Sequence, residues 1–170
     1  MAEQKTRPAS VRAKPRRKAP EAVAPSVMAE PEPILPRGRT APLNPKEQDE
    51  LLHDGVALFN GLRYWHAHEA WETIWRASSE EDRDFYQGLI QVAAGLLHLQ
   101  RRNVRGARNK LAEGLARLRP YEPAHRGVVV SELIGKCQLI LNDLDDGLVP
   151  YLIPPVIRFV EMERARDFDS

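Results

Sequence analysis

The chain has 170 residues, a formal net charge of +1 and one cysteine. This length suits a single domain of ordinary size, and the near-zero charge points to no particular class of partner. A lone cysteine excludes a disulfide within the chain, and no run of residues is apolar enough for a secretory leader or a membrane span. The composition therefore predicts a cytoplasmic protein that does not enter a membrane.

The first 43 residues differ in composition from the rest of the chain. Up to Pro45 the sequence holds nine of its 14 prolines, nine Lys or Arg residues and no aromatic residue. Such a segment buries too little apolar surface to offset the entropy that a chain loses on folding. We predict a disordered arm over residues 1–43, a helical domain over 44–160 and a polar tail over 161–170. The basic stretch 12–18 of the arm can contact nucleic acid or simply keep the protein soluble.

A helix is predicted to begin directly after this arm. In Asn44-Pro45-Lys46-Glu47 the Asn can cap the helix, Pro fits its first position and Glu can complete a capping box. The helix would turn Leu52, Val56 and Phe59 inward and end at Asn60-Gly61, a pair suited to left-handed closure. A second helix is predicted over residues 63–77, with an apolar face made of Tyr64, Ala67, Ala70, Trp71, Ile74 and Trp75.

The longest run without a formal charge, residues 85–99, predicts a central helix that continues to about Arg102. Projected at about 100° per residue, its apolar face consists of Phe85, Leu89, Val92 and Leu96. The opposite side is an uncharged polar stripe of Gln87, Gln91 and His98. A helix that avoids charge all round is normally enclosed by other helices, so these side chains need partners. The preceding helix offers His68 and Glu72, which are four residues apart and therefore adjacent on one edge.

Two more helices complete the predicted fold. The fourth covers residues 104–118, and its inward positions are Val104, Ala107, Leu111, Leu115 and Leu118. Residues 128–130 are predicted to be extended, and a fifth helix starts near Ser131 and closes at Asp145-Asp146-Gly147. The proline-containing segment after it is expected to pack as a strap. With short connections and no alternating strand pattern, the chain is predicted to be all-α, a compact bundle of about five helices.

The middle of the chain resembles a known family. An FN pair is followed by a helix with an AHE tripeptide and a later Glu and Trp, then by a GLIQ helix ending in His and by an N-x-x-G-A turn. This pattern, between Phe59 and Leu118, is similar to that of domain of unknown function family 309. The resemblance implies a bundle of about five helices. It implies no activity, because the family is named for its lack of an assigned function.

The positions that carry the resemblance are Asn60, His68, Glu69, Glu72, Gln87, Gln91, His98 and Asn103. Before Asn103 this chain has Arg102, where the family commonly shows Gly. From these positions and the aromatic ring beside them, we predict five candidate ligand-binding residues: Asn60, Tyr64, Glu69, Gln87 and Arg102.

A polar cluster is predicted between the second and third helices. It consists of His68, Glu72, Gln87, Gln91 and His98. Our main interpretation is structural, with Glu72 ordering an imidazole and the glutamines bridging the two helices. Such a network can fix the register in which helices pack.

A ligand or metal site is the alternative for the same residues. Two His and a Glu on facing helices can bind a divalent transition ion, so His68, Glu72 and His98 are candidate metal ligands. Glutamine, however, is a poor ligand for zinc or iron, and the second His of the zinc-protease helix is missing. Without a metal, a hydrolase would use His68 or His98 as general base, Glu72 to orient it and Gln91 as oxyanion donor. No Ser or Cys nucleophile accompanies this set, so the sequence assigns neither an enzymatic activity nor a cofactor.

An interaction module is the remaining interpretation. The end of the third helix and the fourth helix carry seven Lys or Arg residues against one acid, Glu113. Arginines on a helix can bind phosphate or an acidic partner, so Arg101, Arg105 and Arg108 are candidates for an anionic partner. The alternative is a solvated face that acids near residues 143–146 balance. Trp65 projects away from the apolar face of its helix, and an exposed aromatic there suggests a homo-oligomer contact.

Overall fold

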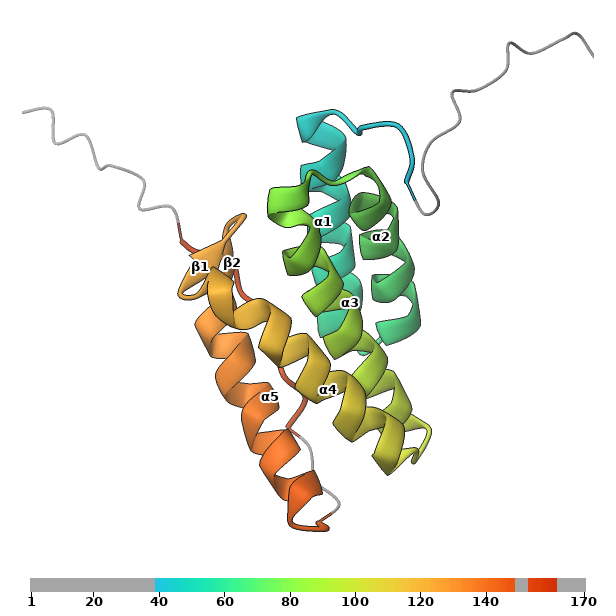
Figure 1. Cartoon of the computed structure of the whole chain (residues 1–170), viewed down its shortest axis with the longest axis vertical. Coiled ribbons are helices and arrows are strands. Elements are labelled where there is room, and N and C mark those ends of the chain that lie inside the picture. Colours follow the sequence, from blue (N-terminus) through green and yellow to red (C-terminus); the bar gives the residue numbers. More distant parts are fainter. Residues whose placement is uncertain (1–38, 149–152, 162–170) are drawn as a thin grey trace, which may run out of the picture. The chain divides into compact units, whose positions relative to one another are not determined.

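The structure, a computed structural model, describes residues 39–148 and 153–161. Over these residues the fold is all-α, as predicted, with five helices and one small β-hairpin (Figure 1). The predicted arm up to residue 38 and the predicted tail from residue 162 lie outside the described residues. The domain limits that the sequence suggests therefore stay predictions.

The helices follow one another closely along the chain. They are α1 (Pro45–Asn60), α2 (Tyr64–Ala77), α3 (Glu80–Gln100), α4 (Val104–Leu118) and α5 (Val130–Asp145). Between α4 and α5 lie a short 3-10 turn (Arg119–Tyr121) and the antiparallel strands β1 (Ala124–His125) and β2 (Val128–Val129). Consecutive helices run in opposite directions, and α3 lies between α2 and α4 (Figure 1). None of the helices in the described ranges is long and apolar enough to cross a membrane.

The ends of α1 show both a confirmed and a wrong prediction. The capping box is present, because Glu47 N donates to Asn44 Oδ1 at 2.9 Å and Asn44 N donates to Glu47 Oε2 at 3.1 Å. The predicted left-handed closure at Asn60-Gly61 is wrong, since Gly61 has a φ of −83° and Leu62 has a φ of +61°. The reversal falls at Leu62 because Arg63 N closes the helix on the Leu58 carbonyl oxygen, at 2.9 Å.

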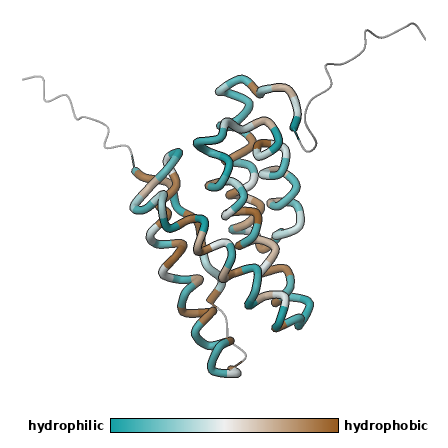
Figure 2. The backbone as a smooth tube through the Cα atoms, viewed as in Figure 1, coloured by the Kyte–Doolittle hydropathy of each residue, from teal (hydrophilic) through white to brown (hydrophobic). Residues whose placement is uncertain are grey.

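The central helix α3 buries the face that the sequence predicts. Its four apolar positions, Phe85, Leu89, Val92 and Leu96, are each no more than 2% exposed. In Figure 2, hydrophobic and hydrophilic stretches alternate along the helices, as expected of helices with one buried side. The polar stripe, however, is only half-buried at Gln87, Gln91 and His98. The expectation that α3 is enclosed all round is therefore wrong, because this stripe lies along the solvent edge of the α3–α4 pair.

Glycines allow α3 and α4 to pack closely. A β-carbon added at Gly88 would lie 2.7 Å from Leu118 Cγ, and one added at Gly95 would lie 2.8 Å from Leu111 Cγ. On the other helix, a β-carbon at Gly114 would lie 3.0 Å from the carbonyl oxygen of Gly88. Real β-carbons do not fit at such distances, so the two backbones approach this closely only because the side chains are absent.

Helix α4 buries four of the five positions that were predicted to point inward. Ala107, Leu111, Leu115 and Leu118 are buried. Val104 is 38% exposed, because it is the first residue of α4 and lies beside the α3–α4 turn.

The strap expected after α5 is present over the residues described there. Asn60 holds it to α1, because its side chain accepts a hydrogen bond from Ile157 N at 2.8 Å and donates one to Ile157 O at 2.9 Å. Phe159 stacks on His53 of α1 with ring centroids 4.1 Å apart, and it forms a β-bridge with Val128 of β2. The strap therefore joins the first helix to the hairpin that precedes the last one.

Candidate functional site

The structure divides the predicted polar cluster into two groups. On α2, His68 Nδ1 lies 3.8 Å from Glu72 Oε2, and Glu72 also pairs with Arg76 at 2.8 Å. On the far side of α3, Gln91 donates to Glu113 of α4 at 3.1 Å. Within residues 39–148 and 153–161, no hydrogen bond or ion pair joins the α2 pair to the α3 stripe.

His98 completes the second group, with its Nδ1 3.2 Å from the Nδ2 of Asn103 in the α3–α4 turn. The prediction that α2 supplies the partners of Gln91 and His98 is therefore wrong. These two residues are seven positions apart, so they share one stripe, and that stripe faces α4 and the turn before it. The polar side chains thus make contacts within separate helix pairs.

The candidate ligand-binding residues do not converge either. Asn60 holds the strap, Tyr64 is buried edge-on against Phe59 with ring centroids 5.1 Å apart, and Glu69 is exposed. Gln87 makes no side-chain hydrogen bond within the described part of the chain, and Arg102 is exposed in the α3–α4 turn. No three His, Cys, Asp or Glu side chains of the described residues come together as a metal site would require.

A cluster of arginines that have no polar partner among the described residues lies at one end of the bundle. We call Arg63, Arg101, Arg102 and Arg105 the arginine tip. Arg63 precedes α2, and the other three surround the α3–α4 turn. Gln100 joins these two turns, since its Nε2 donates to the Leu62 carbonyl oxygen at 3.1 Å. All four arginines are exposed, and none makes a side-chain hydrogen bond or an ion pair with another described residue.

The remaining arginines of the described residues all have partners. Arg108 pairs with Asp145, Arg117 pairs with Asp84 at 2.6 Å, and Arg119 donates to Gln138 at 3.0 Å. Lys110 pairs with Glu113 at 2.7 Å. The basic face of α4 is thus largely neutralised within the fold. Of the three predicted anion-binding arginines, Arg101 and Arg105 remain available and Arg108 does not.

The arginine tip also carries exposed apolar side chains. Leu62 is 44% exposed and Trp65 is 48% exposed, and Val104 lies at the same end. The indole of Trp65 stacks on the ring of His68, with centroids 5.6 Å apart and planes 7° from parallel. The tip therefore offers cationic side chains beside a flat aromatic surface.

Two residues at this end of the bundle have strained backbones. Leu62 has a φ of +61° and Arg102 has a φ of +58°, in the left-handed region that favours glycine. A residue with a side chain costs about 1–2 kcal/mol in this conformation relative to an unstrained one. Glycine at either position would remove this conformational cost. The side chains of Leu62 and Arg102 are therefore present although they make the backbone conformation less stable.

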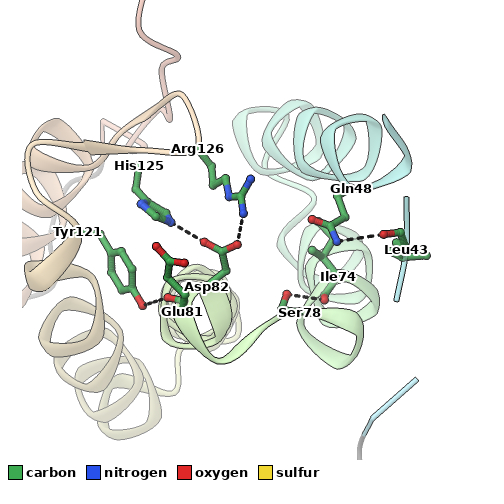
Figure 3. A network of polar contacts seen from close by, with 9 residues as sticks. All are labelled: Leu43, Gln48, Ile74, Ser78, Glu81, Asp82, Tyr121, His125 and Arg126. Atoms are coloured by element: carbon green, nitrogen blue, oxygen red, sulfur yellow. Dashed lines mark hydrogen bonds and ion pairs between the residues drawn. The ribbon is translucent and has the colours of Figure 1, made fainter. Parts of the chain in front are cut away.

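A second site lies at the other end of the bundle, where α2 ends and α3 begins. It surrounds a carboxylate that sequence analysis did not identify. Asp82 is in the first turn of α3 and only 4% exposed. His125 of β1 lies with its Nε2 2.7 Å from Asp82 Oδ1, and Arg126 donates to Asp82 Oδ2 (Figure 3). Burial would raise the pKa of Asp82, but the hydrogen bonds and charges of Arg126 and His125 outweigh it and lower that pKa.

The tight turn between β1 and β2 brings these partners to Asp82. Arg126 and Gly127 form the two-residue turn, with φ values of +50° and +77°. His125 packs edge-on against Phe85 with ring centroids 4.8 Å apart, which holds its imidazole over the start of α3. Sequence reasoning missed this group because Asp82 lies more than 40 residues before His125 and Arg126. The His-Arg-Gly turn was the only local signal.

Two cavities border this group. The larger, of about 580 Å³, opens to solvent, and its polar lining includes Arg39, Gln48, Arg76, Ser79, Asp82 and Arg126. The smaller, of about 170 Å³, is lined by Pro45, Gln48, Asp49, Leu52, Tyr86 and Arg126. Gln48 and Arg126 border both, so we treat the two cavities together as the Asp82 cleft.

Comparison with known proteins assigns the central part of the chain to a family. The family described as Domain of unknown function (DUF309) matches residues 52–109. This segment belongs to the DUF309 family. It runs from the second turn of α1 into α4, so the whole arginine tip lies in the DUF309 segment and the turn that carries Arg126 lies beyond it. No curated protein matches the chain.

Proposed function

We propose that this DUF309 protein binds single-stranded nucleic acid through the arginine tip. The observation that carries the proposal is the distribution of arginine partners. Every described arginine with no polar or aromatic partner of its own lies at one end of the bundle, on two turns that Gln100 joins. Arginines that served only solubility would have no reason to gather there.

The chemistry of the tip favours nucleic acid over an acidic protein. A guanidinium binds either a phosphate or the carboxylate of an acidic protein through two parallel hydrogen bonds. The arginines alone therefore do not distinguish these two kinds of partner. The exposed indole of Trp65 adds a flat surface on which an unpaired base can stack. Arginines beside an exposed aromatic ring are the combination that single strands require.

The strained backbone of Arg102 supports the same proposal. Glycine would relieve the strain, yet this position holds an exposed arginine whose side chain makes no hydrogen bond or ion pair with another described residue. Strain of this kind is retained where a side chain acts outside the fold. The proposal therefore gives Arg102 a reason to be arginine.

Fluorescence anisotropy with a labelled 12-nucleotide single strand tests the proposal on the full chain. The combined Arg63→Gln, Arg101→Gln and Arg105→Gln variant should bind about tenfold more weakly than wild type at moderate salt. A matched control changes Lys46, Lys136 and Arg158 to Gln, which removes the same charge from elsewhere on the surface. Because both variants keep residues 1–38, any binding by that basic segment cancels in the comparison. Equal losses of affinity in the two variants would contradict the proposal.

A second variant separates base stacking from simple charge attraction. Trp65→Ala leaves the net charge unchanged but removes the aromatic surface, and it should weaken binding about tenfold. Trp65→Phe should restore most of the affinity. If Trp65→Ala binds as wild type does, the tip attracts phosphate without stacking bases, and the assignment to single strands fails.

A further inference from the structure

We propose that the Asp82 cleft binds a small organic anion, whose carboxylate or phosphate group accepts hydrogen bonds from Tyr86 and Arg126. This site lies away from the arginine tip and does not depend on nucleic-acid binding. The site combines a tyrosine hydroxyl that has no partner among the described residues, a guanidinium fixed by Asp82 and a cavity of suitable size.

The hydroxyl belongs to Tyr86 of α3. This side chain is 2% exposed and lines the smaller cavity, yet its hydroxyl makes no hydrogen bond within the described residues. A phenol O–H is both a donor and an acceptor, so it can bind a group that reaches it through the cavity. The hydroxyl is therefore placed to donate to a group that enters the cavity.

The guanidinium belongs to Arg126, which borders both cavities. One of its terminal nitrogens binds Asp82, while the side chain remains 50% exposed. Both oxygens of Asp82 are occupied, one by His125 and the other by Arg126. The carboxylate therefore fixes the guanidinium and leaves its other N–H groups without a partner among the described residues.

The walls of the cleft fit a small anion with an apolar part. Arg39 and Arg76 line the larger cavity. Each also forms an ion pair, Arg39 with Glu80 and Arg76 with Glu72. Pro42 and Ala77 supply apolar surface there. Asp49, an acid that lines the smaller cavity, has a partner on its own helix, since its Oδ1 lies 3.5 Å from His53 Nδ1. A volume of about 580 Å³ lies within the range of small-molecule sites.

The test uses the full chain labelled with nitrogen-15, and it follows amide shifts during titration with inorganic phosphate and, separately, with acetate. At constant ionic strength, at least one probe should give saturable shifts at residues of the cleft, such as Gln48, Ser79 and Arg126. The probe that saturates identifies the head group. The variant with three substituted arginines at the tip should respond as wild type does, which separates this site from the nucleic-acid proposal.

Tyr86→Phe is the decisive variant, because it removes only an oxygen that makes no hydrogen bond to another described residue. It should unfold at the same denaturant concentration as wild type or a higher one, and it should bind the saturating probe about tenfold more weakly. Tyr64→Phe is the matched control, since Tyr64 is another buried tyrosine that lines neither cavity. Absence of saturable shifts in wild type with both probes would overturn the proposal, as would unchanged affinity in Tyr86→Phe.

Discussion

Gln100, the last residue of α3, donates a hydrogen bond to the carbonyl oxygen of Leu62 at 3.1 Å. This bond connects the α1–α2 turn to the α3–α4 turn and so brings Arg63 to the same end of the bundle as Arg101, Arg102 and Arg105. The arrangement of the arginine tip therefore depends on a residue that bears no charge.

Gln100→Ala should loosen the tip without disrupting the bundle. The bond is exposed, so its loss should lower the free energy of unfolding by only about 0.5 kcal/mol. Binding of the labelled single strand should weaken two- to threefold, because the arginines of the two turns no longer share one rigid surface. Urea unfolding and anisotropy measure the two quantities. Wild-type affinity in this variant would show that the turns act independently.

Arg102→Gly should separate the needs of the fold from those of the tip. Glycine adopts the left-handed conformation at residue 102 freely, so the free energy of unfolding should stay unchanged or rise by up to about 1 kcal/mol. Affinity for the single strand should fall severalfold, because one phosphate contact is lost. A loss of stability greater than about 1 kcal/mol would mean that the arginine side chain supports the fold after all.

Gly88→Ala should be strongly destabilising, although alanine is normally the better helix former. The added β-carbon would meet Leu118 at 2.7 Å, and overpacking of this kind costs about 1–3 kcal/mol. Gly135→Ala on α5 is the matched control, since nothing lies within 4 Å of its added β-carbon. The control should gain about 0.5–1 kcal/mol from helix propensity. Opposite signs in urea unfolding are expected, and a gain in both variants would refute the close α3–α4 contact.

The stability of the protein should depend on pH through Asp82. Since the folded state lowers the pKa of Asp82, ionised Asp82 stabilises the fold above its unfolded pKa, which is about 3.9 for a free aspartate. That contribution should disappear as the pH falls through the lower folded value. Asp82→Asn should thus be less stable than wild type at pH 6, and the difference should shrink as the pH falls below about 4. A difference that stays constant over this range, followed by urea unfolding, would argue against the Asp82 ion pairs.

Local patterns predicted most of the fold. The capping box of Asn44 and Glu47 and the buried face from Phe85 to Leu96 depend on residues close together in the chain, and both are confirmed. The closure at Leu62 was missed because the glycine beside it is the more usual choice for a positive φ. A propensity cannot reveal which of two neighbours adopts a strained conformation.

The candidate site was harder to predict than the fold. A helical projection gives the direction of Gln91, but it does not say which helix lies there, and α4 supplies its partner instead of α2. Asp82 was not predicted as a site residue, since its partners follow 43 and 44 residues later in a hairpin. Contacts over such separations follow from tertiary packing and leave no local period in the sequence.

Backbone strain gives one link between the two proposed sites. The non-glycine residues with a positive φ in the described parts of the chain are Leu62, Arg102 and Arg126. Arg102 belongs to the arginine tip, Leu62 directly precedes Arg63 of the tip, and Arg126 borders the Asp82 cleft. Strained positions are common where a side chain has a role beyond packing. The placement of these three residues therefore agrees with a binding site at each of these two ends of the bundle.

The most direct test of nucleic-acid binding at the arginine tip is the salt dependence of affinity for the single strand. Anisotropy titrations between about 50 and 200 mM salt give the slope of log K against log salt concentration for each protein. Each arginine–phosphate contact contributes about −0.7 to this slope for single strands. Wild type should therefore have a slope steeper by about 2 than the variant with Arg63, Arg101 and Arg105 changed to Gln, while the Lys46, Lys136 and Arg158 control should match wild type. Identical slopes for wild type and the tip variant would contradict the proposal that these arginines contact the phosphates.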